Sequence, residues 1–313
     1  MPETIVTLTM NPAVDLCARV ERVVPFHKLR CATSGRDPGG GGINVARAIH
    51  RMGGDPLAVF PVGGPIGQLL ERLVAEEGVR RATIEVANHT REDITIDENA
   101  TGAQFRFVLA GMPLSAAESE ACVVLLSAKA AGAKYVVASG SLPPGLADDF
   151  YAGIAKVAVA AGAKFILDTS GPALKAALGS DMHLIKPSLR EFTELVGYAL
   201  PDERAWLEAA RRIIANRGAE MIALSLGERG AALIGADFAL RASAPAVASV
   251  STVGAGDSFL GALVRSFAQD MPAQDALRMA VAAGSAAMLS AGTDLCHPAD
   301  VHRLAKDVEI RPL

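Results

Sequence analysis

Residues 251–262 read Ser-Thr-Val-Gly-Ala-Gly-Asp-Ser-Phe-Leu-Gly-Ala, a glycine-rich turn that leads into an apolar stretch of helical spacing. The first backbone N–H groups of a helix have no partner within it, so they can bind an anion. Asp257 would lie beside this anion hole, where its carboxylate could take a proton from an attacking hydroxyl group. The pattern therefore favours phosphoryl transfer. The alternative is an ordinary helix N-terminus, capped by Asp257 or Ser258.

A second glycine-rich segment, Pro-Gly-Gly-Gly-Gly-Ile-Asn at 38–44, leads directly into a helical pattern. Four glycines let the backbone approach a ligand that a Cβ atom would obstruct. The segment lacks the Gly-Lys-Ser/Thr ending of a P-loop, and it lacks the preceding strand and following acid of a dinucleotide fingerprint. A polyhydroxylated substrate fits better, bound by glycine N–H groups and the Asn44 amide. A flexible loop with an asparagine cap is the alternative.

Composition narrows the class of protein and its ligands. The chain has 313 residues, of which half are hydrophobic and 4% aromatic, which suits one large α/β domain with a core of small aliphatic side chains. The formal net charge of -4 gives no general attraction to nucleic acid or to an anionic membrane, so neither is an expected partner. A local cluster of Lys and Arg would have to hold any anionic substrate.

The N-terminal sequence and the cysteines favour a cytoplasmic protein. Residues 1–7 contain no basic region before an apolar core, and no uncharged apolar run of 18 residues occurs. These features argue against a signal peptide and a membrane span. The four cysteines, Cys17, Cys31, Cys122 and Cys296, are far apart and form no CxxC motif, so we expect reduced thiols.

Short apolar runs alternate with longer helical patterns along most of the chain. Strands are predicted at 5–10, 56–62, 134–139, 164–168, 183–186 and 221–226, and helices at 43–52, 66–77, 116–131, 148–161, 189–196 and 203–217. This alternation predicts an α/β fold with a mainly parallel central sheet and helices on both faces. Ligands of such a sheet bind at the carboxyl ends of its strands.

Two segments, 14–37 and 90–109, interrupt this alternation because they lack strong helical periodicity. Residues 93–97 and 104–108 alternate between apolar and polar side chains, as half-exposed strands do. We interpret the two segments as one small β-sheet lid inserted into a single domain, 1–313. Two separate hairpins are the alternative.

Small polar or acidic residues follow several predicted strands. Asn11 and Asp15 come after the first strand and could bond to sugar hydroxyls, although an Asx turn around the intervening proline is an equal alternative. Glu191 could orient water around Mg²⁺, or it could simply favour the helix dipole in the first turn of its helix. The loops 139–145 and 225–230 also leave strands; the second is either a plain hairpin or a turn against a nucleotide phosphate.

Lys28, Arg30 and Arg91 lie in the predicted lid. Each alone is an ordinary solvated surface group, but together on a flap they could clamp a substrate phosphate. The six histidines show no metal-ligand spacing, and no Ser-His-Asp arrangement is recognisable.

In this order, the segments resemble the PfkB branch of the ribokinase-like sugar kinases, and within it the minor bacterial 6-phosphofructokinases. The resemblance extends over essentially the whole chain, and its two signatures are 39–52 and 251–262. It implies a ribokinase-like fold and ATP-dependent phosphorylation of fructose 6-phosphate at its 1-hydroxyl group. It also implies a homodimer formed through the lid.

The resemblance assigns a role to individual residues. Asp257 would be the base, with Gly254 and the N–H groups of Ala255, Gly256 and Asp257 forming the anion hole. The sugar would be held by Asn11, Asp15, Gly40, Gly41, Asn44 and Ser141, and its phosphate by Lys28 and Arg91. The ATP site would be lined by Lys186, Ser225, Gly227, Gly230, Thr252, Gly254 and Ser285. A monovalent cation, K⁺, would be bound by Ser251, Val253, Ala287, Ser290 and Gly292.

One motif departs from the family pattern. The family's Asn-x-x-Glu motif, which lies beside Mg²⁺ and the triphosphate, is Ser188-Leu189-Arg190-Glu191 in this chain. Serine is shorter than asparagine and has no amide, so the arrangement of Mg²⁺ and triphosphate near Ser188 is open. Activity is still expected, because Glu191 is present.

Alternative activities remain within and outside the kinase class. 1-Phosphofructokinase and tagatose-6-phosphate kinase act on sugars that differ in phosphate position or in one stereocentre. Outside the class, a non-catalytic sugar-phosphate sensor could keep the same fold. The intact Gly-Ala-Gly-Asp sequence at 254–257 argues against a sensor, since a sensor needs no base.

Overall fold

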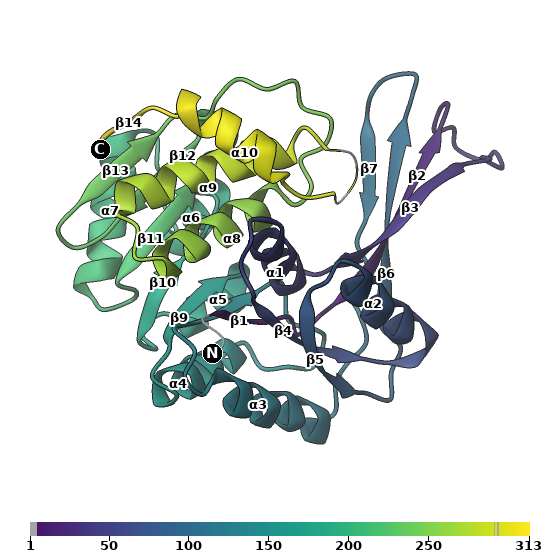
Figure 1. The fold of residues 1–313 in the computed structure, drawn as a ribbon, viewed down its shortest axis with the longest axis horizontal. Coiled ribbons are helices and arrows are strands. Elements are labelled where there is room, and N and C mark those ends of the chain that lie inside the picture. The colour runs from purple at the N-terminus through teal and green to yellow at the C-terminus, as the bar shows by residue number, and fades with distance from the viewer. Residues whose placement is uncertain (1–4, 291, 293) are drawn as a thin grey trace.

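The apolar runs of the sequence form a ten-stranded sheet in this computed structural model, which describes residues 5–290, 292 and 294–313. The strands are β1 (Ile5–Leu8), β4 (Leu57–Val62), β5 (Arg80–Glu85), β8 (Tyr135–Ser139), β9 (Lys164–Asp168), β10 (Met182–Ile185), β11 (Met221–Ser225), β12 (Ala231–Ile234), β13 (Ala239–Ala242) and β14 (Ile310–Pro312). Their order is β14-β13-β12-β11-β10-β9-β8-β1-β4-β5 (Figure 1). The strands from β5 to β11 are parallel, and β12, β13 and β14 extend the sheet in antiparallel fashion.

Helices cover both faces of this sheet. One face carries α1 (Gly41–Arg51), α2 (Gly64–Glu76), α8 (Ala255–Ala268), α9 (Ala273–Ala287) and α10 (Pro298–Leu304), and the other carries α3 (Ala116–Ala130), α4 (Phe150–Ala160), α5 (Gly171–Ala177), α6 (Leu189–Val196) and α7 (Glu203–Ala215). The side chains of each central strand alternate between the two layers. In β8, Val136 packs with α3 and α4, whereas Val137 packs with α1 and α8. The predicted α/β sheet with helices on both faces is confirmed.

A separate four-stranded sheet stands at one side of the molecule (Figure 1). It consists of β2 (Ala13–Val20), β3 (Ala32–Gly39), β6 (Arg91–Glu98) and β7 (Gln104–Phe107), in the order β3-β2-β6-β7. Parallel pairing of β2 with β6 joins two segments that are far apart in the sequence, so they are not independent hairpins. That this sheet works as a lid stays a prediction.

The predicted strands and helices agree with the structure to within two residues at each end. Seven strands and α-helices were not predicted: β5, the antiparallel strands β12, β13 and β14, and the helices α5, α9 and α10. Of the four cysteines, Cys17, Cys122 and Cys296 are buried and Cys31 is exposed. Over the described ranges, no helix has both the length and the apolar character that crossing a bilayer requires.

Candidate active site

The loops that leave the parallel strands meet at one edge of the large sheet. Asn11 follows β1, Ser141 follows β8, and Lys186 follows β10, while Asp168 and Ser225 end β9 and β11. Because these strands are parallel, their carboxyl ends lie together. These polar residues thus gather at the edge of the sheet where the ligand site was predicted.

The N-terminus of α8 faces this edge without a side-chain cap. Its N-cap residue, Gly254, has φ 74°, a left-handed conformation in which an added Cβ atom would collide with Leu295 Cδ2. Gly254 makes the turn and Asp257 and Ser258 lie at the start of the helix, but neither side chain caps it. The N–H groups of Ala255, Gly256 and Asp257 belong to the first turn, which has no intrahelical acceptors for them. N–H groups in this position are suited to bind an anion, and the predicted anion site at this turn stays a prediction.

Asp257 lies on the first turn of α8 and lines a cavity of about 180 Å³, together with Gly41, Ser139–Ser141, Asp168 and Glu191. Its Oδ2 accepts a hydrogen bond of 3.0 Å from Asn44 Nδ2. Although the side chain is partly accessible, burial raises the pKa of Asp257 to about 6, and the nearby Asp168 adds to the shift. Asn44, Lys186 and Arg47 oppose the shift. A carboxylate with this pKa is suited to accept a proton near neutral pH.

A buried ion pair stands next to the anion site. Lys186 Nζ is 3.0 Å from Asp168 Oδ1, and Ser139 Oγ donates to Asp168 Oδ2 at 3.2 Å. Burial opposes a charge on Lys186, but the neighbouring carboxylates outweigh it and raise the pKa of Lys186. The ammonium nitrogen is 3.6 Å from where a Cβ atom of Gly256 would be. A full positive charge therefore reinforces the helix N–H groups.

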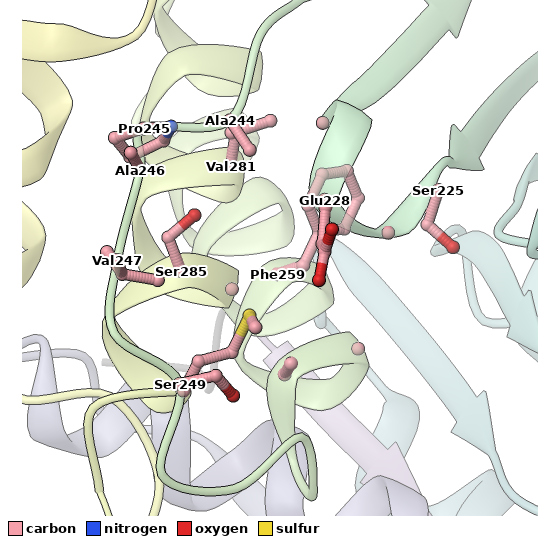
Figure 2. Close-up of a pocket in the computed structure, with 16 residues that line it drawn as sticks. Ser225, Glu228, Ala244, Pro245, Ala246, Val247, Ser249, Phe259, Val281 and Ser285 are labelled. Atoms are coloured by element: carbon pink, nitrogen blue, oxygen red, sulfur yellow. The ribbon is translucent and has the colours of Figure 1, made fainter.

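A larger cavity of about 510 Å³ opens on the other side of the same helical turn (Figure 2). Ser225 and Glu228 form one wall, and residues 244–247 form the opposite wall (Figure 2). Phe259, Val281 and Met288 supply apolar surface, and Ala255 and Gly256 connect this cavity to the anion site. Four of the predicted ATP-site residues line it: Ser225, Gly227, Gly230 and Ser285. Its size and mixed lining suit a nucleotide.

Two of the predicted sugar-binding residues, Gly41 and Ser141, line the smaller cavity, and Asn11 and Asn44 bond to residues that line it. Asn11 Nδ2 donates to Ser141 Oγ at 3.3 Å and to the Ala110 carbonyl at 3.0 Å. Gly41 lines the cavity, and an added Cβ atom there would collide with Ser139 Oγ. Gly40 precedes α1 as its N-cap residue. The two glycine-rich segments, 38–44 and 251–257, thus lie on either side of one cavity.

Of the charged residues predicted to bind the sugar, two are near the site and one is not. Burial and the neighbouring Asp93 raise the pKa of Asp15 to about 6. Arg91 binds Asp93 at 2.7 Å and donates to the Asn11 carbonyl at 3.1 Å, so it also braces the first strand exit. Lys28 is exposed on the connection between β2 and β3. This connection lies at the end of the small sheet that is farther from α8 (Figure 1). The role of Arg91 and Lys28 in binding a phosphate stays a prediction.

Comparison with known proteins agrees with this arrangement. The pattern of the pfkB family of carbohydrate kinases matches residues 8–300. The chain belongs to this family. The ATP-dependent 6-phosphofructokinase isozyme 2 of Mycobacterium tuberculosis is 43% identical over 96% of this chain and 88% of its own length. The 1-phosphofructokinase of Xanthomonas campestris is 32% identical over 85% of this chain and 84% of its own length.

Solved structures of phosphofructokinase-2 from Escherichia coli have the same fold. The crystal structure in complex with fructose-6-phosphate is 36% identical, with a TM-score of 0.92. The crystal structure in complex with potassium is 38% identical, with a TM-score of 0.93. Each alignment covers 98% of this chain and 99% of the other.

The segment that departs from the pfkB family pattern is built as a helix cap. Ser188 is the N-cap of α6, and its N–H and Oγ donate to Glu191 Oε2 at 2.7 and 2.8 Å. Glu191 also lines the smaller cavity. Ser188 thus holds the Glu191 carboxylate in place. Thr252, predicted in the ATP site, is exposed in the turn before α8, and neither it nor Ser188 lines the larger cavity.

The residues predicted to bind a monovalent cation come together beside α8. Ser251 Oγ donates to the Gly292 carbonyl at 3.2 Å and accepts from the Val253 N–H at 3.2 Å. Ser290 N–H donates to the Ala287 carbonyl at 3.2 Å. Binding of K⁺ by these groups stays a prediction.

Two residues in or behind the candidate site, Asp168 and Arg47, were not singled out in the sequence. Asp168 ends a predicted strand, so its position at the carboxyl edge of the sheet was a usable signal. Glu228, which lines the larger cavity, lies within the segment 225–230 that was expected to line the ATP site. Arg47 interrupts the apolar side of α1, and no sequence pattern distinguishes it from an ordinary surface arginine.

Proposed function

We propose that this protein transfers the γ-phosphoryl group of ATP to the 1-hydroxyl group of fructose 6-phosphate, giving fructose 1,6-bisphosphate and ADP. The observation that carries the proposal is the position of Asp257. Its carboxylate lines the smaller cavity, while the uncapped N-terminus of its own helix connects to the larger one. An acceptor hydroxyl and a triphosphate can therefore meet at one helical turn. The 43% identical relative is a 6-phosphofructokinase, which supports the choice of sugar.

The geometry supports one chemical step. Asp257 accepts the proton of the 1-hydroxyl group while the hydroxyl oxygen forms a bond to the γ-phosphorus. The bond from the γ-phosphorus to the bridging oxygen breaks, and ADP leaves with that electron pair. The N–H groups of Ala255 and Gly256, with Lys186, stabilise the negative charge on the transferred phosphoryl oxygens.

The residues present fit Mg²⁺ as a cofactor. Mg²⁺ prefers oxygen ligands and keeps several waters, so one carboxylate at the cavity wall suffices to hold it through water. Glu191 is that carboxylate; Asp168 is already engaged through both oxygens, by Lys186 and Ser139. When bound, Mg²⁺ neutralises charge on the phosphates. K⁺ would act at a distance from the sugar, by fixing the loop 250–253 against the end of α9, and the potassium complex of the Escherichia coli relative supports its inclusion.

The small sheet is the proposed lid and the proposed interface of a homodimer. The small sheet and its connections expose apolar side chains, including Phe26, Phe107 and Val108, which a second copy could cover. The protein is proposed to work in the cytoplasm, where ATP and sugar phosphates are present. Neither nucleic acid nor a membrane is a proposed partner.

Two alternatives stay open under this proposal. 1-Phosphofructokinase or tagatose-6-phosphate kinase activity would use the same base and anion site on a differently placed sugar phosphate. The lower identity to the 1-phosphofructokinase, 32% against 43%, favours fructose 6-phosphate. A non-catalytic sensor would not need a base held at 3.0 Å by Asn44.

A substrate panel tests the proposal. Purified protein with Mg·ATP should release ADP fastest with fructose 6-phosphate, compared with fructose 1-phosphate, tagatose 6-phosphate and fructose. A tenfold preference for another sugar in kcat/KM would overturn the assignment. Asp257→Asn should lower kcat by about 10²–10⁴-fold, the scale for a general base, and keep ATP binding. A protein that binds sugar phosphate but turns none over would be a sensor.

A further inference from the structure

Arg47 is the largest side chain with no exposed surface in the described part of the chain. It lies on α1, one turn after Asn44. Burying a guanidinium costs several kcal/mol unless counter-charges and hydrogen bonds compensate, and an apolar residue there would often be as stable or more so. A buried arginine on this face of α1 therefore suggests that its N–H donors hold other groups in place.

The guanidinium of Arg47 reaches three separate elements. Its Nη1 donates to Asn44 Oδ1 at 3.0 Å and to the Pro38 carbonyl of β3 at 2.9 Å. Its Nε donates to Oε1 of Glu77, the C-cap residue of α2, at 2.9 Å, and its Nη2 bonds to the same carboxylate. The side chain thus links the small sheet, α2 and the Asn44 amide.

The bond to Asn44 fixes which end of the amide faces the site. A guanidinium has only donors, so it can bond only to the carbonyl oxygen of Asn44. The amide NH₂ must then point away from Arg47, and it donates to Asp257 Oδ2 at 3.0 Å. With the amide reversed, its NH₂ would meet the Arg47 donors and its oxygen would meet the Asp257 carboxylate, so both bonds would be lost.

We propose that Arg47 is a positioning residue, which acts through the Asn44 amide to hold one oxygen of Asp257 and leave the other directed at the acceptor hydroxyl group. This inference rests on the proposed function. Arg47 is not among the residues that line either cavity. Its effect on the reaction passes through Asn44 and through its charge.

The charge of Arg47 acts on the base in the same direction as the amide bond. Burial and the Asp168 carboxylate raise the pKa of Asp257, and Asn44, Lys186 and Arg47 lower it. Glu191 is the other titratable group on the cavity wall. Loss of Arg47 should therefore raise the pKa of Asp257 further and shift the acid limb of kcat to higher pH.

Arg51 offers a matched control on the next turn of the same helix. It also pairs with Glu77, at 3.3 Å, and with Asp294 at 2.6 Å. Arg51→Met removes a partly buried cation from the same ion-pair network without touching the Asn44 amide. Arg47→Met removes both the charge and the amide contact, and Arg47→Lys keeps the charge but not the planar fork.

The test is a double-mutant cycle in kcat at saturating fructose 6-phosphate and ATP. Arg47→Met should lower kcat by about 10- to 100-fold, the scale for a misplaced catalytic group. In an Asn44→Ala background the same change should lower kcat by less than about threefold, because the two residues act in series. Arg51→Met should leave kcat within about twofold. An equal loss with and without Asn44 would refute the relay.

A second readout needs no turnover, so it separates failure of this inference from failure of the proposed function. A ¹³C-carboxyl NMR titration of Asp257, assigned with Asp257→Asn, should move to higher pH in Arg47→Met and stay in place in Arg51→Met. Should Arg47→Met not fold, Arg47→Lys replaces it: kcat should fall, and the titration of Asp257 should move to higher pH, because the Asn44 bond that lowers its pKa is weakened. Wild-type kcat in Arg47→Lys, or an unmoved titration in Arg47→Met, overturns the inference.

Discussion

The pKa of Asp257 predicts how kcat falls on the acid side of the pH profile. Burial raises this pKa from 3.8 to about 6. The base is active when ionised, so activity is complete above pH 7 and falls as the pH drops through 6. At pH 5, about one tenth of Asp257 would be ionised, whereas more than about nine tenths of an aspartate with pKa 3.8 would be. The kcat should thus be about tenfold lower at pH 5 than at pH 7.5.

The assay is kcat for ADP release between pH 4.5 and 8.5, at saturating substrates. Asp15 has a similarly raised pKa, and fructose 6-phosphate itself titrates in this range, but both act mainly on sugar binding and so on kcat/KM. Samples returned from pH 5 to pH 7.5 should recover full activity, which controls for unfolding. Asn44→Ala should move the limb to higher pH, because the Asn44 bond favours the ionised carboxylate. A limb near pH 4 would refute the assigned environment, and so would an unmoved limb in Asn44→Ala.

Three further predictions concern the same turn and its two cavities. Asp257→Asn should raise the free energy of unfolding at pH 7.5 by at most about 3 kcal/mol, because it removes a carboxylate whose ionised form is destabilised by burial. This gain in stability should shrink as the pH falls from 6 toward 4, because Asp257 of the wild type is then protonated. Lys186→Met should lower the free energy of unfolding by about 3–5 kcal/mol in urea titrations and also lower kcat, because it leaves Asp168 buried without its counter-ion. Val247→Trp should raise the KM for ATP at least about tenfold by filling the larger cavity, and leave the sugar KM unchanged. Val250→Trp, an exposed neighbour outside the cavity lining, is its control.

The strands that could be predicted from the sequence are those whose apolar runs are buried in the folded chain. The strands β8 and β9 are short apolar runs between glycine-terminated helices, and both lie in the middle of the sheet. The strand β5 was missed because it is an edge strand with an arginine pair at its start and largely accessible side chains. The strands β12 and β13 were missed because they are four-residue segments at the antiparallel extension.

The turn that carries Asp257 could be predicted from the sequence, whereas the contacts behind it could not. Gly254 and Asp257 are recognisable in the sequence by residue type and spacing. The bond from Asn44 to Asp257 joins residues that are 213 positions apart, and only the folded chain shows it. Arg47 carries no signal of burial in the sequence, since its surroundings are supplied by β3 and α2. Lys28 and Arg91 were grouped because both lie in the predicted lid segments. Lys28, however, lies on the connection between β2 and β3, whereas Arg91 begins β6 and bonds to the Asn11 carbonyl.

The two cavities are contributed by different stretches of the polypeptide. Apart from Asp257, the smaller one is lined by residues from the first 191 positions, and the larger one by residues from 225 onward. A substitution that reshapes one compartment therefore leaves the walls of the other untouched. With the proposed assignment of sugar to the smaller cavity and ATP to the larger one, substitutions in the N-terminal portion alone would change the sugar specificity and leave the nucleotide site unchanged.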